Sequence, residues 1–375
     1  MTAPFPLPVS DALIDDLRRR IEATRWGPEW PMSPWDAGTD SATLRRLAER
    51  WVSGFDWRAM EAEILALPSV MTEVRGTPIH AFVFEGETAD AQALILTNGW
   101  PSTSYEMVDV ARRLSSPSSF GETSRTSFTV VVPSLPGFPF SPQRPGVRTE
   151  THELWHELMT SLGFSRYGAH GGDLGSGITS RLAQAHPEAV TGIHVMSVVP
   201  PIELDESTLT DAERRYRKEM AEWTELAGSY EHQQQRQPLT LAPALSDSPV
   251  GLLAWIVEKY RAWSDCDGDI GRRFTDDFLL TQASLYWFTN SISTSFRPYY
   301  EHAHGLTPAV RSVATPTAVA VFPHDIARPP REWIERTYNL TRYTVMPRGG
   351  HFAPHEEPEL LSGDIRAFFD EVDGR

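Results

Sequence analysis

One stretch, residues 167–178, constrains the fold of this chain more than any other, and it reads Tyr-Gly-Ala-His-Gly-Gly-Asp-Leu-Gly-Ser-Gly-Ile. Asp173 follows a pair of glycines, Gly175 comes two residues later, and an amphipathic segment begins at once. Small residues around a central polar one are typical of a very tight strand-to-helix turn, the nucleophile elbow. A glycine-rich turn with an aspartate in it is often only a turn. The rest of the chain must therefore support a catalytic interpretation of Asp173.

The composition excludes several classes of function. The chain has 375 residues and a formal net charge of −16, which argues against nucleic acid and anionic membrane surfaces as partners. Its single cysteine, Cys266, cannot form an internal disulfide, and we interpret it as a bystander thiol in a reducing cytoplasm. The first residues lack the segments of a signal peptide, and no apolar run reaches membrane-spanning length. We therefore expect a soluble, cytoplasmic protein with no membrane association.

Strand and helix patterns alternate through the middle of the chain and again near its end. An alternating run over residues 74–84 is interrupted by Arg75-Gly76, which predicts a hairpin. Short apolar strands at 94–96 and 128–132, the strand into the elbow and a strand at 192–199 are separated by helical stretches. This alternation predicts βαβ units and a mostly parallel sheet. Reactive groups in such sheets gather at the carboxyl ends of the strands.

Two blocks of the chain show helical patterns only. Helices in the first block are joined by proline and tryptophan residues and seldom form their own core, so we expect them to wrap around the main domain. The second block follows Pro200 and contains a capping box at Thr210 and a helix that starts at Ser248-Pro249. The sequence therefore predicts four segments: a helical meander packed on the core (1–66), the first part of an α/β core (67–200), an inserted helical cap (201–305) and the second part of the core (306–375).

Three residues occur in the order that the α/β-hydrolase plan requires, namely nucleophile, acid and histidine. They are Asp173 at the elbow, Asp325 just after a predicted strand, and His351 just after the next strand. Each also has an ordinary interpretation as a turn or loop residue. Glu203 and Asp205, which follow the strand after the elbow, are rival acids. Because all three residues occupy the expected positions together, we predict the α/β-hydrolase fold with these residues in its active site.

Such a site also needs two backbone N–H groups that hold a negatively charged oxygen. We expect one from Leu174, the residue after the elbow aspartate. The other should come from Trp100 in the loop Asn98-Gly99-Trp100-Pro101, where Pro101 would fix the turn, with a cis peptide as one way to do so. The loss of one such donor typically costs about 2.7–4 kcal/mol in rate terms.

An aspartate in place of the usual serine determines which bond can be broken. A serine that displaced a leaving group at a saturated carbon would form an ether, which activated water could not cleave. An aspartate forms an ester whose carbonyl belongs to the enzyme, so water activated by His351 can attack that carbonyl and restore Asp173. No Gly-x-Ser-x-Gly occurs in the chain. We therefore predict an epoxide or an alkyl halide as the electrophile, rather than a peptide or an ordinary ester.

The choice between epoxide and halide depends on the group that stabilises the leaving atom. A halide needs N–H donors, usually including a tryptophan beside the nucleophile, where this chain has Leu174. A ring-opened alkoxide needs a proton, which a phenol with a pKa of about 10 can donate. Tyr230 and Tyr299 in the predicted cap are candidates, although a cap tyrosine is more often a packing residue. An epoxide is the preferred substrate, with a haloalkane dehalogenase and a non-catalytic binding protein of the same fold as alternatives.

Several longer motifs extend this pattern over nearly the whole chain. They are Phe55-Asp56-Trp57-Arg58, Gly99-Trp100-Pro101-Ser102 with Tyr105-Glu106, Pro133-Ser134-Leu135-Pro136-Gly137-Phe138, Gly171-Gly172-Asp173, Asp247-Ser248-Pro249-Val250-Gly251, Arg297 with Tyr299 and Glu301, and Arg348-Gly349-Gly350-His351-Phe352. With these motifs in this order, the chain resembles the microsomal-type epoxide hydrolases, and more closely their soluble bacterial relatives.

The resemblance implies a role for each candidate residue. It makes Asp173 the nucleophile, His351 the base that activates water, and Asp325 the acid partner of that histidine. Tyr299 matches the family's tyrosine after an Arg-x pair, and Tyr230 matches the earlier cap tyrosine in a looser context. The bacterial group includes enzymes of natural-product pathways, among them enediyne antibiotic biosynthesis, whose substrates are bulky aryl epoxides. The resemblance therefore implies a cofactor-free enzyme for a bulky hydrophobic or aryl epoxide.

Three positions depart from the family pattern. Asn98 replaces the histidine of a His-Gly-Trp-Pro motif, and we expect activity to survive because the donor is a backbone N–H nearby. Leu174 replaces a tryptophan, which removes an aromatic wall, and Pro139 replaces a glycine in a loop at the edge of the site. We expect an epoxide and water as partners, no metal and no cofactor, and we allow for a homodimer.

Overall fold

The computed structural model describes residues 7–122 and 126–374 of the chain. Within these residues, eight strands form one sheet in the order β1-β2-β4-β3-β5-β6-β7-β8. Their bounds are β1 Ser69–Val74, β2 Thr77–Phe84, β3 Gln92–Thr97, β4 Phe128–Pro133, β5 Tyr167–Gly171, β6 Val190–Val195, β7 Val313–Val321 and β8 Tyr338–Val345. The first two strands form the predicted hairpin, and the pairs from β4 to β8 in this order are all parallel. This topology confirms the predicted α/β-hydrolase fold.

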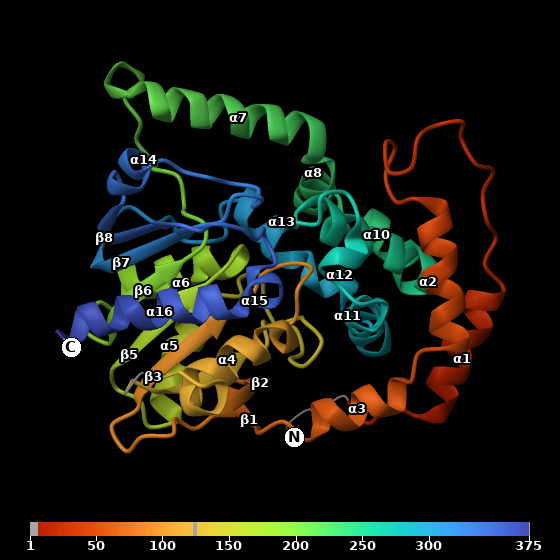
Figure 1. The fold of residues 1–375 in the computed structure, drawn as a ribbon, viewed down its shortest axis with the longest axis horizontal. Coiled ribbons are helices and arrows are strands. Elements are labelled where there is room, and N and C mark those ends of the chain that lie inside the picture. Colours follow the sequence, from red (N-terminus) through yellow and green to blue (C-terminus); the bar gives the residue numbers. More distant parts are fainter. Residues whose placement is uncertain (1–6, 123–125, 375) are drawn as a thin grey trace.

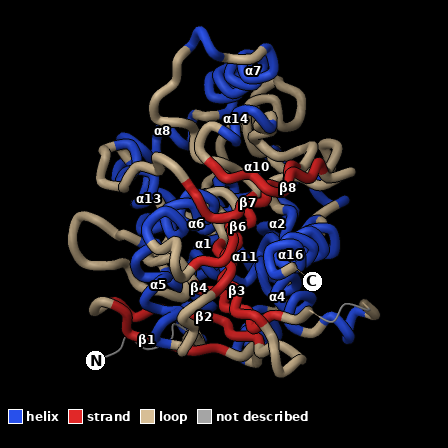
Figure 2. Tube along the Cα trace, turned by 90° about the vertical axis from the view of Figure 1, so that its left-hand side faces the viewer, coloured by secondary structure: helices blue, strands red, loops and turns tan. Residues whose placement is uncertain are grey.

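Helices cover both faces of the sheet (Figures 1 and 2). On one face lie α4 (Val108–Ser115) and α16 (Pro358–Asp373), and on the other lie α5 (Thr151–Ser161) and α6 (Leu174–Ala185). Two short helices, α14 (Arg331–Glu335) and α15 (Ala353–Glu356), belong to the last connections. Because both faces are covered, the central strands are apolar throughout, as in β3, where residues 94–96 are fully buried.

The chain between β6 and β7 forms a block of helices at one end of the sheet (Figure 1). Two helices of this block begin where the sequence predicts. The Thr210 hydroxyl and the Glu213 carboxylate form a reciprocal capping box, and Ser248 caps a helix whose first residue is Pro249. The seven helices of this block in the described residues are α7 Asp211–Ala227, α8 Ser229–Arg236, α9 Pro238–Asp247, α10 Pro249–Ala262, α11 Asp276–Thr289, α12 Ile292–Ser295 and α13 Arg297–Ala303.

The N-terminal helices α1 (Asp11–Glu22), α2 (Ser41–Ser53) and α3 (Trp57–Leu65) lie against this helical block rather than along the sheet (Figure 1). Arg50 on α2 forms a two-pronged ion pair with Asp277 on α11, with distances of 2.7 and 2.9 Å. The Trp51 indole donates to the Ser284 hydroxyl at 2.9 Å. The first segment therefore supports the helices that lie over the sheet. It also contacts the core, since the Tyr105 hydroxyl donates to Glu63 on α3 at 3.0 Å, and its role as a segment wrapped around the main domain stays a prediction.

Two expectations about the chemistry of the chain can be compared with the structure. No single described helix is both long enough and apolar enough to cross a membrane, and α9 and α10 meet that criterion only as a pair bent by 117°. Cys266 is buried, and its thiol contacts the Arg261 carbonyl at 3.3 Å. The boundaries of the four segments and the cytoplasmic location stay predictions.

Candidate active site

The predicted elbow joins β5 to α6. Asp173 has φ +51° and ψ −123°, a conformation that non-glycine residues rarely adopt. The turn is closed so tightly that a Cβ at Gly175 would lie 2.1 Å from the Thr97 carbonyl oxygen. The Ser176 hydroxyl donates to the Gly171 carbonyl at 2.7 Å and holds the first turn of α6. The backbone therefore projects the Asp173 side chain away from the sheet, beyond the carboxyl end of β5.

The loop after β3 meets the Asp173 carboxylate. The Trp100 N–H donates to Asp173 Oδ1 at 2.8 Å, and a Cβ at Gly99 would lie 2.2 Å from the same oxygen. Only glycine at position 99 permits this approach. The Asn98 amide donates to the carbonyls of Gly99 and Ser102, at 2.9 Å each, and the Trp100–Pro101 peptide is cis. One predicted backbone donor therefore already contacts the nucleophile, in a loop that Asn98 holds.

The second predicted donor is Leu174, the first residue of α6. The N–H groups of the first turn of a helix have no partner within the helix, and they carry part of its positive dipole. The Leu174 N–H is therefore available to an oxygen on the Asp173 side chain next to it.

Two loops from neighbouring strands bring the histidine and its acid together. His351 Nδ1 lies 2.7 Å from Asp325 Oδ1, and His351 Nε2 lies 3.7 Å from Asp173 Oδ2. The Ile326 N–H donates to Asp325 at 2.6 Å, and the His351 N–H donates to the Trp263 carbonyl at 2.8 Å. The three residues thus form one connected array after β5, β7 and β8. The rival acids Glu203 and Asp205 are exposed, and the latter accepts from Ser207.

The electrostatics of the site favour a charged histidine in the free protein. Burial lowers the pKa of His351, but the hydrogen bond and charge of Asp325 and the charges of Asp173 and Glu106 outweigh it and raise the pKa to about 9. A chemical step that neutralises Asp173 removes one of these charges, so it lowers the pKa of His351 and makes the imidazole a better proton acceptor at neutral pH.

Sequence reasoning missed two buried carboxyl groups near the histidine. Glu106 accepts from the Tyr260 hydroxyl at 2.8 Å, and Glu356 accepts from the N–H groups of Asp265 and Phe352. Burial raises the pKa of each glutamate to about 7. Tyr260 is 154 residues from Glu106 and Asp265 is 91 residues from Glu356, so spacing in the sequence carried no signal for these contacts.

The two predicted tyrosines face the nucleophile from the helical block. Tyr230 on α8 stacks on the Trp100 indole with ring centroids 5.5 Å apart, and Tyr299 on α13 meets the same indole edge-on at 6.1 Å. Burial, followed by the charge of Asp173, raises the pKa of both phenols well above the usual value, so both keep their protons at neutral pH. The two phenols also affect each other's pKa through a contact between their hydroxyl groups, and among the described residues the Tyr299 hydroxyl has no other hydrogen-bond partner. It therefore retains a proton for donation to a ligand.

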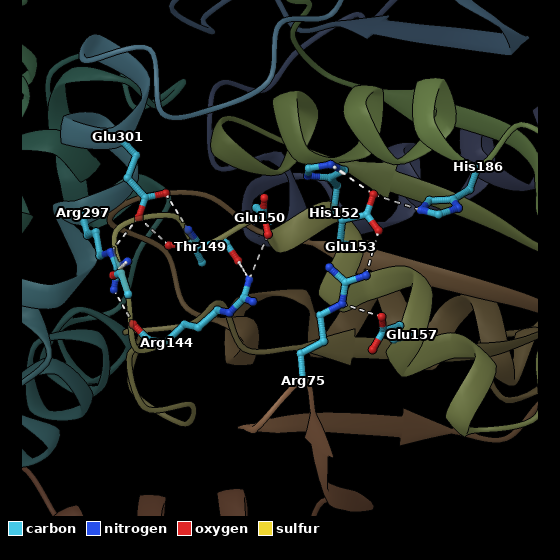
Figure 3. Close-up of polar contacts among 11 residues, drawn as sticks. Arg75, Arg144, Thr149, Glu150, His152, Glu153, Glu157, His186, Arg297 and Glu301 are labelled. Atoms are coloured by element: carbon cyan, nitrogen blue, oxygen red, sulfur yellow. Dashed lines mark hydrogen bonds and ion pairs between the residues drawn. The ribbon is translucent and has the colours of Figure 1, made fainter.

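A polar network fixes the helix that carries Tyr299 (Figure 3). Glu301 on α13 accepts from the Arg297 guanidinium at 2.6 Å, from the Thr149 hydroxyl at 2.7 Å and from the Thr149 N–H at 3.0 Å. Arg297 also donates to the carbonyls of Arg144 and Gly146. The loop before α5 and the helix α13 are thereby joined across more than 150 residues of sequence.

These residues border one cavity of about 350 Å³. Asp173, His351, Tyr230 and Tyr299 all line it. Much of the remaining wall is apolar and comes from α6, α7 and the loops beside them, including Leu135, Ile178, Val199, Met220, Trp223 and Leu306. A cavity of this size and character accepts a small organic molecule. Among the described residues, no cluster of histidine, cysteine or acidic side chains is arranged to hold a metal ion.

Comparison with known proteins agrees with this geometry. Residues 2–107 match the family described as epoxide hydrolase N terminus, and residues 92–248 match the α/β hydrolase fold family. The chain is 34% identical to epoxide hydrolase 1 of Sus scrofa in an alignment of 402 positions, gaps included, that covers 97% of this chain and 88% of that protein.

Solved structures give the same result. The structure of an Aspergillus niger epoxide hydrolase superposes with a TM-score of 0.86 at 30% identity and covers 99% of this chain and 97% of its own. The juvenile hormone epoxide hydrolase of Bombyx mori superposes with a TM-score of 0.90 at 26% identity and covers 100% of this chain and 96% of its own. The chain therefore belongs to the microsomal-type epoxide hydrolase family, whose members share the α/β-hydrolase fold.

Proposed function

We propose that this enzyme converts an epoxide to a vicinal diol through a covalent ester on Asp173. The single observation that carries the proposal is the environment of the Asp173 carboxylate. One oxygen accepts from the Trp100 N–H at 2.8 Å, and the other lies 3.7 Å from His351 Nε2 and borders the cavity. A carboxylate held in this way can attack with one oxygen while the other stays in the position of an oxyanion.

The first half-reaction opens the ring. Asp173 Oδ2 attacks one ring carbon, the bond between that carbon and the epoxide oxygen breaks, and the new alkoxide takes a proton from Tyr299 or Tyr230. The raised pKa of both phenols supports this role, because each carries its proton at neutral pH. The product of this step is a monoester of the diol and the enzyme.

The second half-reaction cleaves that ester. His351 Nε2 removes a proton from water, the water oxygen attacks the Asp173 carbonyl carbon, and the N–H groups of Trp100 and Leu174 stabilise the charge on Oδ1. The bond to Oδ2 then breaks, and the diol leaves with that oxygen and the proton from His351. The regenerated Asp173 carboxylic acid then transfers its proton to the phenolate that ring opening left, which restores both groups. The net reaction is epoxide plus water to diol.

The substrate class follows from the cavity walls. Met220, Trp223 and Leu306 line the space next to the reacting groups, which favours a hydrophobic or aryl substituent on the epoxide. A place in natural-product biosynthesis is a prediction of the sequence resemblance alone. Turnover of a panel of aryl and alkyl epoxides, with chiral analysis of the diols, tests the preference.

A single turnover in ¹⁸O-labelled water tests the covalent mechanism. We expect unlabelled diol and one labelled oxygen in the peptide that contains Asp173, measured by mass spectrometry. Label in the diol of the first turnover would mean direct attack of water on the epoxide. A parallel reaction with the Asp173→Ala protein controls for spontaneous hydrolysis.

A further inference from the structure

One cation that lines the substrate cavity has no acidic partner. Arg181 stands on α6, eight residues after Asp173, and borders the same cavity. Its Nε donates to the Pro308 carbonyl at 2.7 Å. Among the described residues, no carboxylate forms an ion pair with it, and burial lowers its pKa. The Arg181 side chain is half-buried, so a ligand that displaced water from this end of the cavity would leave the charge without a counter-ion unless the ligand were itself an anion.

The side chain of Arg181 folds back along α6 toward the start of that helix. A Cβ at Gly177 would lie 3.0 Å from Arg181 Nη1, so the side chain folds over Gly177, which also lines the cavity. Side chains of a helix lean toward its N-terminus, which is where Asp173 stands. Gly177 is four residues from Asp173, or about 6 Å along the helix axis. Asp173, Gly177 and Arg181 all border the same cavity, from one helix and its N-cap.

Two neutral histidines border the cavity near this charge. His302 follows Tyr299 by three residues on α13, and His152 belongs to α5. Burial lowers the pKa of both, to about 4 for His152, and the charge of Arg181 lowers both further. Both rings are therefore uncharged at neutral pH. They add hydrogen-bonding groups without a second formal charge.

The acidic residues around the cavity have other partners (Figure 3). Glu301 pairs with Arg297 at 2.6 Å, Glu150 with Arg144 at 3.5 Å, and Glu153 with Arg75 at 3.2 Å. Glu231, beside Tyr230, accepts from the Gln235 amide at 2.8 Å. The charge of Arg181 is left for something that enters the cavity.

We propose that the end of the cavity at Arg181 binds a carboxylate, so that the preferred substrate is an epoxide that also carries a carboxylic acid. A planar guanidinium presents paired N–H groups that match a carboxylate better than any neutral acceptor. The helix rise of about 6 Å from Asp173 to Gly177, over which the Arg181 guanidinium folds, corresponds to roughly five bonds in an extended chain. An aryl epoxide with a para carboxylate has this spacing. The substrate class rests on the proposed function, whereas the carboxylate site can be tested without turnover.

The test compares 4-(oxiran-2-yl)benzoate with 4-(oxiran-2-yl)benzamide, which has the same shape and no charge. We expect kcat/KM of the wild-type enzyme to favour the acid by at least about tenfold, since hydrogen bonds to charged groups are worth about 1.5–3 kcal/mol. Arg181→Gln should abolish the preference, and Arg181→Lys should retain part of it. The matched control is Arg166→Gln, which removes an exposed guanidinium outside the cavity and should keep the full preference.

Equal kcat/KM for acid and amide in the wild type, or an undiminished preference in Arg181→Gln, would overturn the inference. Calorimetric binding of the two diol products to the wild type and to folded Arg181→Gln or Arg181→Lys decides it without turnover. Tighter binding of the acid diol that depends on Arg181 supports the site, and equal binding of the two diols contradicts it. If no epoxide were hydrolysed, the proposed function would fail while this binding result still stood on its own.

Discussion

The active site combines two regions that hold their reactive groups in different ways. In the sheet region, Asp173, Asp325 and His351 follow three strands, and each is held by backbone groups: the N–H of Trp100, the N–H of Ile326 and the carbonyl of Trp263. In the helical region, Tyr230 and Tyr299 are held by ring packing on Trp100 and by the ion pair and hydrogen bonds around Glu301. The first region is set by main-chain geometry and the second by side-chain packing.

This difference separates the two halves of the proposed reaction. In the proposed mechanism, the sheet region supplies the nucleophile, the oxyanion donors and the base, which all act in ester hydrolysis. The helical region supplies the proton for ring opening. Changes in one region should therefore stop one half-reaction and leave the other intact, with the nucleophile common to both.

The largest effect on kcat is expected from a change at Asp173, which acts in both proposed half-reactions. Asp173→Ala removes the atom that bonds to substrate, so kcat should fall by at least about 10⁴-fold. Steady-state diol formation measures it, and a circular dichroism melt shows that the variant is folded. Asp205→Ala, an exposed acid on the next loop, is the matched control and should have wild-type kcat. Substantial diol formation by Asp173→Ala would refute the nucleophile assignment.

A change confined to the sheet region should trap the ester. His351→Gln removes the base but leaves Asp173 and the phenols, so ester hydrolysis should slow by about 10²–10⁴-fold while alkylation continues. Intact-protein mass spectrometry should then show an adduct with the mass of one epoxide. An unmodified protein that is also inactive would place the histidine in the first half-reaction instead.

A change confined to the helical region should have the opposite signature. Tyr230→Phe with Tyr299→Phe removes both proton donors, and alkylation should slow on the order of 10²-fold. Rapid-quench mass spectrometry should find no accumulated ester, because hydrolysis becomes the faster step. Each single variant, which keeps one phenol, serves as the internal control and should fall between the wild type and the double variant. Ester accumulation in the double variant would contradict the assignment of the two tyrosines to ring opening.

The pH dependence of ester hydrolysis sharpens the description of the sheet region. Hydrolysis needs neutral His351, so its rate should rise about tenfold per pH unit below the pKa of that histidine and level off above it. Glu106 is one of the charges that raise this pKa, and its own pKa is about 7. Glu106→Gln removes that charge, so the rising limb should move to lower pH. Stopped-flow measurement of ester decay in both proteins checks the direction, and a move to higher pH would be inconsistent with it.

The smallest effect concerns stability of the helical region alone. Ser248 caps α10 by accepting from the Gly251 N–H at 3.0 Å, and Ser248→Ala should lower the free energy of unfolding by about 1 kcal/mol. Because Ser248 does not border the cavity, kcat should not change. Ser248→Asp, which keeps a side-chain acceptor, is the control for urea unfolding curves. A loss of activity without a loss of stability would mean that α10 has a direct role in catalysis.

Much of the sheet region was predictable because its signals are local. The elbow depends on the residues next to Asp173, and the order of Asp173, Asp325 and His351 follows from strand ends. The helix starts at Thr210 and Ser248 were equally predictable from the sequence, since a helix cap is made by residues three positions apart. The Trp100 donor could also be predicted, because its loop follows β3, the strand that pairs with the strand before the elbow.

The contacts between distant segments were not predictable in this way. The N-terminal helices meet α11 through Arg50 and Asp277, and Glu106 meets Tyr260 across 154 residues. Nothing at these positions distinguishes them from ordinary surface or core residues until the helices are packed. The charge of Arg181 is a further case, because an arginine on a helix is unremarkable until the packing shows that no carboxylate of the described residues forms an ion pair with it.

By itself, the sequence determined the fold class and the positions of Asp173, Asp325 and His351 at the turns where reactive residues are predicted, because turns, caps and strand ends depend on neighbours in the chain. Only the tertiary structure decided which acid reaches His351, how the two tyrosines approach Asp173 through Trp100, and which cavity charge forms no ion pair within residues 7–122 and 126–374. Those facts depend on distances between residues more than 25 positions apart, such as His351 and Asp325, which only the packing of the chain sets.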